Sequence, residues 1–223
     1  MKILLLNPNS SELVTERLAA EARRCEREGL QIDVRFCENG PKEIVTARDE
    51  LTAGYLAVRR LETEADRYDG AVIGCFADPG LPGARAAMGK PVAGFLESSL
   101  IWAGLMGLRY SIIASGGYGD RSIFTNDVSA RGYLNRLASV RCLHSTVEGA
   151  AKTDLKQLAE LAELCRREDG ADVVILGCAG FAGLGRVLSQ MTSIPVVDGV
   201  MESVLLAESM VRRWEAGKWE ENG

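Results

Sequence analysis

Short apolar segments alternate with longer segments of helical periodicity along almost the whole chain. Residues 2–6, 70–74 and 171–176 are aliphatic runs of strand length, which is typical of strands buried on both faces of a parallel sheet. Between such runs, apolar residues recur at helical spacing, as in 154–167. This alternation predicts parallel α/β sheets. The expected strands are 2–6, 31–36, 70–74, 91–94, 110–115, 140–143, 171–176 and 194–197.

Several residues are expected to mark the ends of helices. Ser10 or Ser11 is expected to cap the first helix. Asp78 precedes a proline, which predicts that a helix begins there. Asp198 is expected to cap the last helix, which should end before Trp214 and leave the polar residues after it frayed.

The helix expected near 49–66 carries four large side chains on one face, namely Leu51, Tyr55, Val58 and Leu61. Further helices are expected at 97–106, 120–136, 154–167 and 180–191.

The second half of the chain repeats the first. Residues 71–75 end in Gly-Cys, as do residues 174–178. A Gly-Leu pair follows each cysteine, and a Pro-Val strand followed by a Glu-Ser pair comes later in each half. The opening strand 2–6 has its counterpart in 109–114. We therefore infer the duplication of one α/β unit.

Two cysteines, Cys75 and Cys178, end equivalent strands of this repeat. Ligands of open parallel sheets bind beyond the carboxyl ends of the strands. The segments Asn7-Pro8-Asn9-Ser10 and Ser115-Gly116-Gly117 follow strands in the same way. If the two halves pack face to face, the two thiols meet across one cleft.

Two opposed thiols suit a racemase, which removes a proton from one face of a carbon and returns one to the other. A thiolate on one side and a thiol on the other perform both transfers. The pKa of a free thiol is about 8.5, and a helix N-terminus brings it closer to neutrality. This scheme requires no metal and no organic cofactor.

The segments that carry these residues resemble the aspartate/glutamate/hydantoin racemase superfamily, and within it the hydantoin and allantoin racemase branch. The resemblance implies an α/β fold of two pseudo-symmetric flavodoxin-like lobes, each a short parallel sheet flanked by helices, with the site in the cleft between them. Lobe 1 is expected to span 1–97, completed by the C-terminal helix 199–223, and lobe 2 to span 98–198. The segments are Leu5–Ser10, Gly74–Leu81, Leu176–Gly180 and Pro195–Val200.

The resemblance assigns the catalytic pair to Cys75 and Cys178, with no cofactor. It also implies that Asn7, Asn9 and the turn after Ser115 contact the substrate. Backbone N–H groups after each cysteine are expected to stabilise the enolate oxygen of the reacting substrate. The candidate substrate-binding residues are Asn7, Asn9, Ser10, Phe76, Ala77, Ser115, Gly116, Ala179 and Gly180.

The residues beside the thiols favour a neutral, ring-shaped substrate. Phe76-Ala77 and Ala179-Gly180 stand where glutamate and aspartate racemases carry asparagine or threonine. We therefore expect a 5-substituted hydantoin or allantoin. The alternatives are an amino-acid racemase, a maleate isomerase or a decarboxylase of the same superfamily, or a non-catalytic protein that binds a small molecule.

Composition limits which kinds of partner and which cellular compartment are expected. The net charge is −5 and no run of Lys and Arg occurs, which argues against nucleic-acid binding. The apolar runs are too short to span a bilayer, and the N-terminal residues lack a signal-peptide pattern. We expect a cytoplasmic homo-oligomer with reduced cysteines. His144, the single histidine, is expected to be a structural or surface residue, and four cysteines are expected to be packing residues: Cys25, Cys37, Cys142 and Cys165.

Overall fold

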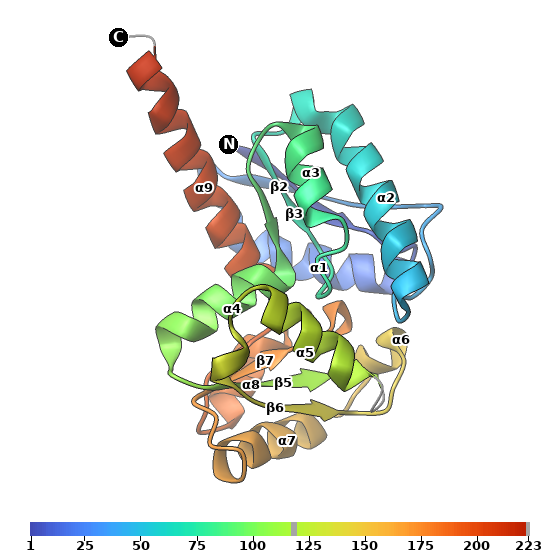
Figure 1. Ribbon diagram of the computed structural model, residues 1–223, viewed down its shortest axis with the longest axis vertical. Helices are drawn as coiled ribbons and strands as arrows, with labels where there is room; N and C mark the ends of the chain where they lie inside the picture. Colours follow the sequence, from blue (N-terminus) through green and yellow to red (C-terminus); the bar gives the residue numbers. More distant parts are fainter. Residues whose placement is uncertain (117–119, 222–223) are drawn as a thin grey trace. The chain divides into compact units, whose positions relative to one another are not determined.

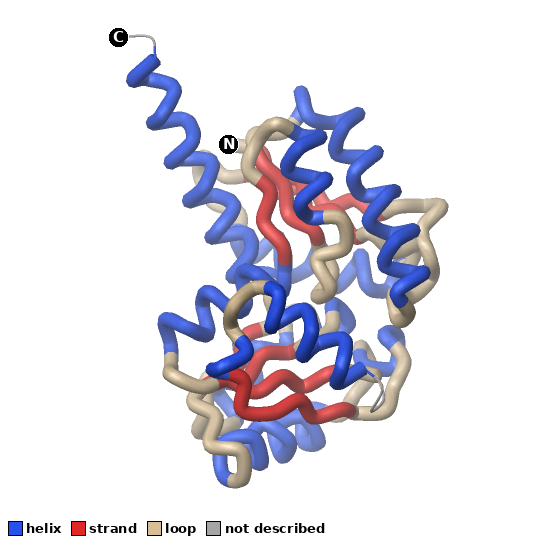
Figure 2. Tube along the Cα trace, in the orientation of Figure 1, coloured by secondary structure: helices blue, strands red, loops and turns tan. Residues whose placement is uncertain are grey.

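The computed structural model describes residues 1–116 and 120–221, together with the side chains of all of these except 120–123 and 218–221. The chain divides into two compact units. Met1–Phe95 and Val200–Gly223 form the first unit, and Leu96–Gly199 form the second. Figure 2 shows that each unit contains its own sheet with helices around it.

The first unit is built on a four-stranded parallel sheet with the order β2-β1-β3-β4. This is the order in which doubly wound flavodoxin-like sheets begin. The side chains of Ile3 to Leu6 are fully buried, as expected of a strand covered on both faces. The strands are β1 (Lys2–Asn7), β2 (Gln31–Phe36), β3 (Gly70–Ile73) and β4 (Val92–Gly94).

Helices cover both faces of this sheet (Figure 1). On one face lie α1 (Glu12–Cys25) and α9 (Val200–Glu221), which pack against each other. On the other face lie α2 (Ala47–Glu64), which leads into η1 (Ala65–Arg67), and α3 (Leu81–Met88). The C-terminal helix therefore completes the first unit, although it follows a strand of the second.

The second unit repeats this topology with the order β6-β5-β7-β8, again all parallel. In Figure 1, α5 and α7 lie on opposite faces of the β5–β6 part of the sheet. The strands are β5 (Tyr110–Ala114), β6 (Leu137–Cys142), β7 (Val173–Leu176) and β8 (Val196–Val197). The helices are α4 (Phe95–Met106), α5 (Asp120–Ala130), η2 (Leu134–Arg136), α6 (Val147–Ala150), α7 (Leu155–Arg167), η3 (Ala179–Phe181) and α8 (Leu184–Met191).

The expected start of the helix after Cys75 is wrong. Asp78 does not cap it, because α3 begins at Leu81 behind Gly80, which has a left-handed φ of 73°. Gly183 precedes α8 with a φ of 83°, so the equivalent helices of the two units begin in the same way. Glycine adopts this conformation without the strain that a Cβ would add. At the other end of the repeat, the carboxylate of Asp198 accepts a hydrogen bond within the first turn of α8.

The face of α2 that carries the large side chains is mostly exposed. Leu51 and Tyr55 are 77% and 65% exposed. The buried face is instead made of small residues together with Leu61 and Glu64. A Cβ on Gly54 would lie 2.9 Å from the backbone nitrogen of Gly80, so α2 packs against the start of α3 at a distance that only glycine allows.

The last helix is longer than expected. α9 continues through Trp214 to Glu221. The segment contains no proline, and Glu208 pairs with Arg212 one turn later at 2.8 Å. Ser11, rather than Ser10, caps α1, and its Oγ accepts from the Val14 N–H at 3.4 Å.

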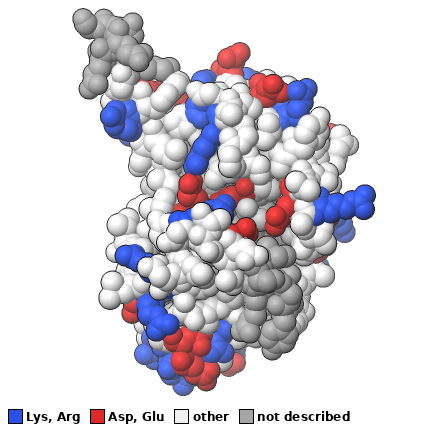
Figure 3. All heavy atoms as spheres, in the orientation of Figure 1, with Lys and Arg blue, Asp and Glu red and all other residues white. Residues whose placement is uncertain are grey.

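The surface carries charges of both signs. On the face shown in Figure 3, Lys and Arg side chains lie among Asp and Glu, in small groups rather than one extended field. Within the described ranges, none of the helices is long and apolar enough to cross a bilayer.

Candidate functional site

The Cys75 turn follows the end of β3. The Gly74 N–H donates to the Leu6 carbonyl at 2.8 Å, which extends the pairing with β1 by one residue. A tight turn then closes, because the Asp78 N–H donates to the Cys75 carbonyl at 3.0 Å. The Cys75 side chain is half-buried. The turn is thereby anchored on both sides of Cys75.

Cys178 occupies the same position in the second unit. The Gly177 N–H donates to the Ile113 carbonyl at 2.8 Å, and the Phe181 N–H donates to the Cys178 carbonyl at 3.0 Å. These are the counterparts of the two bonds around Cys75. The predicted repeat is therefore confirmed in the hydrogen-bond pattern of the cysteine turns as well as in the strand order.

The sulfur of Cys178 lies at the start of η3 and is buried. The Gly180 N–H donates to Cys178 Sγ at 3.4 Å. An N–H group that donates to sulfur favours the thiolate over the thiol. A Cβ on Gly180 would lie 2.4 Å from the Val147 carbonyl oxygen, so this N–H is held in place by close packing against α6.

The segment after β1 is a closed network of amide groups. Asn7 is fully buried, and its Nδ2 donates to Asn9 Oδ1 and to Thr15 Oγ1, both at 2.9 Å. Its Oδ1 accepts from the Asn9 N–H at 3.2 Å. The polar atoms of Asn7 are thus engaged in shaping the loop, and its contact with a substrate stays a prediction.

Asn9 has a different place in this network. Its Oδ1 accepts from Asn7 and from the Ser11 N–H at 2.9 Å. Its Nδ2 donates to no group within the described part of the chain. Ser10 is half-buried, and its N–H donates to the Pro41 carbonyl at 3.1 Å. Among these three residues, the Asn9 amide nitrogen is the donor best suited to a ligand.

The turn after β5 is fixed to the segment that follows β6. The Ser115 carbonyl accepts from the Ser145 N–H at 2.6 Å, and the Gly116 carbonyl accepts from the His144 N–H at 3.0 Å. His144 is exposed and has a left-handed φ of 55°. Gly117, the second glycine of the predicted turn, lies outside the described residues.

Each unit brings its candidate residues to one edge of its sheet. In the first unit, Leu6 pairs with Ile73, so the Asn7–Ser10 segment and the Cys75 turn leave neighbouring strands at the same end. In the second unit, Ile113 pairs with Leu176, which places the Ser115 turn beside the Cys178 turn. Phe76 and Ala179 are buried directly after the cysteines.

Two of the other cysteines are inert thiols. Burial raises the pKa of Cys37 to about 11, although Arg60 lowers it. Burial raises the pKa of Cys165 to about 11 as well, and the Asp169 carboxylate adds to the effect. Thiols with such pKa values stay protonated at neutral pH and do not act as bases or nucleophiles. Cys25 is buried and Cys142 half-buried.

Within residues 1–116 and 124–217, no group of three or more His, Cys, Asp or Glu side chains is arranged to hold a metal ion.

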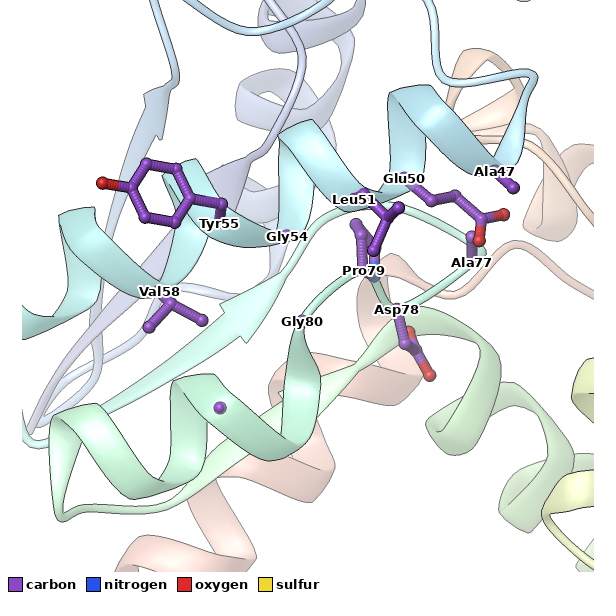
Figure 4. A pocket seen from close by; sticks show the side chains of 11 residues that line it. Ala47, Glu50, Leu51, Gly54, Tyr55, Val58, Ala77, Asp78, Pro79 and Gly80 are labelled. Carbon is purple, nitrogen blue, oxygen red and sulfur yellow. The ribbon is translucent and has the colours of Figure 1, made fainter.

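Sequence reasoning missed a pocket of about 580 Å³ in the first unit. Figure 4 shows Glu50 and Leu51 of α2 over Ala77 and Pro79, which belong to the loop after Cys75. The Asp78 side chain points away from α2 in this view. The signal for this pocket was the stripe of small residues that brings α2 close to the loop.

Comparison with known proteins identifies the class. The chain belongs to the Asp/Glu/hydantoin racemase family, whose model matches residues 3–207. Within that family it falls in the hydantoin and allantoin racemase branch. It is 34% identical to the hydantoin racemase of Paenarthrobacter aurescens over 220 residues. The matched region covers 95% of this chain and 91% of that protein.

Solved structures agree with this placement. The allantoin racemase from Klebsiella pneumoniae superposes with a TM-score of 0.88 at 27% identity, over 95% of this chain and 88% of that one. The allantoin racemase from Pseudomonas fluorescens gives a TM-score of 0.87 at 29% identity, over 95% and 91%. The α/β fold, the family and the racemase class predicted from the sequence are confirmed, and the reacting residues stay a prediction.

Proposed function

We propose that this chain racemises a 5-substituted hydantoin, allantoin included, with Cys75 and Cys178 as the two acid/base groups. The observation that carries the proposal is the equivalence of the two cysteine turns. Each turn follows the third strand of a sheet with the same order, and each is closed by an i to i+3 hydrogen bond of 3.0 Å. The similarity to hydantoin and allantoin racemases supports the same reaction.

The reaction is a pair of proton transfers at one carbon. The thiolate of one cysteine removes the proton from C5 of the ring, and the electron pair moves onto the neighbouring carbonyl to give an enolate. The thiol of the other cysteine then donates its proton to the opposite face of C5. The two cysteines have exchanged protonation states at the end, and the return reaction restores them.

The enolate oxygen needs hydrogen-bond donors that are in place before it forms. The Nδ2 group of Asn9 is one candidate. The backbone N–H groups at Phe76-Ala77 and Ala179-Gly180 are the others. The Gly180 N–H already donates to Cys178 Sγ at 3.4 Å, so in this scheme it stabilises the Cys178 thiolate before the enolate forms.

The surroundings of the thiols support a neutral ring over an amino acid. A substrate carboxylate buried beside the cysteines would require an opposite charge or several donors. The residues that follow the cysteines are Phe76-Ala77 and Ala179-Gly180, which supply neither a charged side chain nor a hydroxyl group. A hydantoin ring exposes two N–H groups and two carbonyls without a charge to neutralise.

We also propose that the enzyme works in the cytoplasm as a homo-oligomer. All six cysteines are free thiols, in keeping with a reducing compartment. The exposed Leu51 and Tyr55 on α2 supply apolar surface for subunit contacts. Light scattering on the purified protein measures the oligomeric state, and a monomeric mass at micromolar concentration would contradict it.

The test uses Cys75→Ser and Cys178→Ser, with Cys25→Ser as the matched control. Polarimetry follows single enantiomers of allantoin and 5-substituted hydantoins. Each site variant is expected to lose racemisation by about 10²–10⁴-fold, because one of the two proton transfers loses its acid or base. The control is expected to keep it. Full activity of either Cys75→Ser or Cys178→Ser would refute the two-thiol scheme.

A further inference from the structure

A buried carboxylate lies near the end of the fourth strand in both units. In the first unit this strand ends in Gly94, and the carboxyl of Asp78 fills the space above it. A Cβ on Gly94 would lie 2.3 Å from both Cγ and Oδ1 of Asp78. In the second unit the residue after β8 is itself an aspartate, Asp198, with its carboxylate buried.

Strand register shows that these two places are equivalent. Gly94 pairs with Ile73, two residues before Cys75. Val197 pairs with Ile175, so the next residue, Asp198, stands opposite the residue two before Cys178. The carboxylate therefore occupies corresponding positions, although it comes from the cysteine loop in one unit and from the strand end in the other.

Placing an aspartate at either position costs folding free energy. Asp78 is 4% exposed and has a left-handed φ of 49°, which disfavours any residue with a Cβ. Asp198 is 6% exposed. A buried carboxylate is retained only where the surrounding groups compensate for its lost hydration. Strained or buried polar residues of this kind are concentrated at functional sites.

Each carboxylate is tied to the segment that carries one thiol. Asp78 is the last residue of the Cys75 turn, which its backbone N–H closes on the Cys75 carbonyl at 3.0 Å, and its carboxyl lies against Gly94 at the end of β4. Asp198 Oδ2 accepts from the Gly185 N–H at 3.0 Å in the first turn of α8, the helix that follows the Cys178 turn. We therefore expect removal of the Asp78 carboxylate to loosen the Cys75 turn, and removal of the Asp198 carboxylate to loosen the start of α8 behind the Cys178 turn.

From this geometry we infer that Asp78 and Asp198 are positioning residues, Asp78 for the thiol of Cys75 and Asp198 for the thiol of Cys178. The inference rests on the proposed two-thiol racemisation. The new element is that each thiol is positioned by a carboxylate, which comes from the cysteine loop in the first unit and from the end of the fourth strand in the second. Neither aspartate touches the reacting carbon in this scheme.

The test separates positioning from general loss of structure by measuring the two directions of the reaction. One cysteine removes the C5 proton of one enantiomer, and the other cysteine removes that of its mirror image. If Asp78→Gly slows transfer at Cys75 alone, the isotope effect of C5-deuterated substrate rises in the direction that Cys75 initiates and falls in the other. Asp198→Ala is expected to produce the opposite asymmetry.

The expected loss of kcat/KM is about 10–100-fold for each variant, as is typical of small misplacements at reacting atoms. Asp198→Asn retains an acceptor oxygen for the Gly185 N–H and is expected to recover part of the activity. Asp154→Ala is the matched control, since Asp154 caps α7 at the Lys156 N–H at 3.0 Å. It should lower the melting temperature without splitting the isotope effects.

A transplant tests the equivalence of the two places directly. The double variant Asp78→Gly with Gly94→Asp supplies the carboxylate from the strand end, as in the second unit. It is expected to regain activity lost in Asp78→Gly. Equal changes of the isotope effect in both directions, or full activity of Asp78→Gly, would overturn the inference. If instead Cys75→Ser or Cys178→Ser still racemises, the proposed function itself fails.

Discussion

Gly180→Ala is the substitution that most directly tests how Cys178 is kept reactive. A Cβ at this position would lie 2.4 Å from the Val147 carbonyl oxygen, which the Ala151 N–H already holds within α6. Ordinary contact requires 3.4 Å or more, so η3 has to move by about 1 Å. That displacement breaks the 3.4 Å bond from the Gly180 N–H to Cys178 Sγ.

The size of the effect follows from the charge on the acceptor. A hydrogen bond to a charged group contributes about 1.5–3 kcal/mol, which corresponds to roughly one to two powers of ten in thiolate population. The rate of Cys178 alkylation by iodoacetamide at pH 7 should fall by that factor. Overpacking costs about 1–3 kcal/mol of folding free energy, which leaves a domain of ordinary stability folded.

Peptide mass spectrometry after short labelling gives the rate at each cysteine. Cys75 in the same sample is the internal reference, and Gly83→Ala is the control variant. A Cβ on Gly83 meets only the Val58 side chain, at 3.1 Å from its Cγ2, and that side chain can move. An unchanged Cys178 rate in folded Gly180→Ala would refute the role given to the Gly180 N–H.

Two further predictions concern groups outside the proposed site. Burial raises the pKa of Glu208, but the hydrogen bonds and charges of Arg212 and Arg27 lower it by more. The pKa of Glu208 therefore lies below its usual range. Its ion pairs thus stabilise the fold above about pH 5, and the contribution is lost as the pH falls through the folded pKa. Glu208→Gln should cost about 1 kcal/mol at pH 7, because both arginines are exposed, and urea unfolding should show the difference from wild type shrinking towards pH 3. Cys37 and Cys165, with pKa values of about 11, should resist iodoacetamide at pH 7 until the protein is unfolded, and labelling of either in the native state would contradict their burial.

The strand segments and the repeated cysteines at their ends were predictable because they depend on local pattern. A fully buried run such as Ile3 to Leu6 leaves little choice but a central parallel strand. The Gly-Cys pairs were recognisable because both follow such a run. The packed position of Gly180 was not predictable, since nothing in the sequence shows that Val147 approaches it.

The errors in helix ends and faces have a common cause in backbone packing. Asp78 before proline has the pattern of an N-cap, but the helix begins behind Gly80, whose positive φ the sequence does not reveal. Leu51 and Tyr55 share a face that is exposed, because Gly54 allows α2 to approach α3 along its small residues instead. Side-chain size predicts burial poorly where two backbones approach closely.

The carboxylates were missed for a different reason. Aligning the repeat compares residues at matching positions, and Asp78 and Asp198 do not match. Only the structure shows that the Asp78 side chain occupies the space above Gly94, the counterpart of Asp198. A duplicated fold can retain a chemical group in each half while moving it to another element, and sequence comparison of the halves does not detect this.

The central claim is that two different thiols act on the two faces of one carbon. Proton NMR in D₂O tests it most directly, with a single enantiomer of allantoin or a 5-substituted hydantoin and a control without enzyme. The thiol that donates has exchanged its proton for deuterium from the solvent, so the account predicts that early product contains deuterium at C5 while recovered substrate keeps its proton. Deuterium entering both enantiomers equally from the earliest times, or no exchange with any of these substrates, would contradict it.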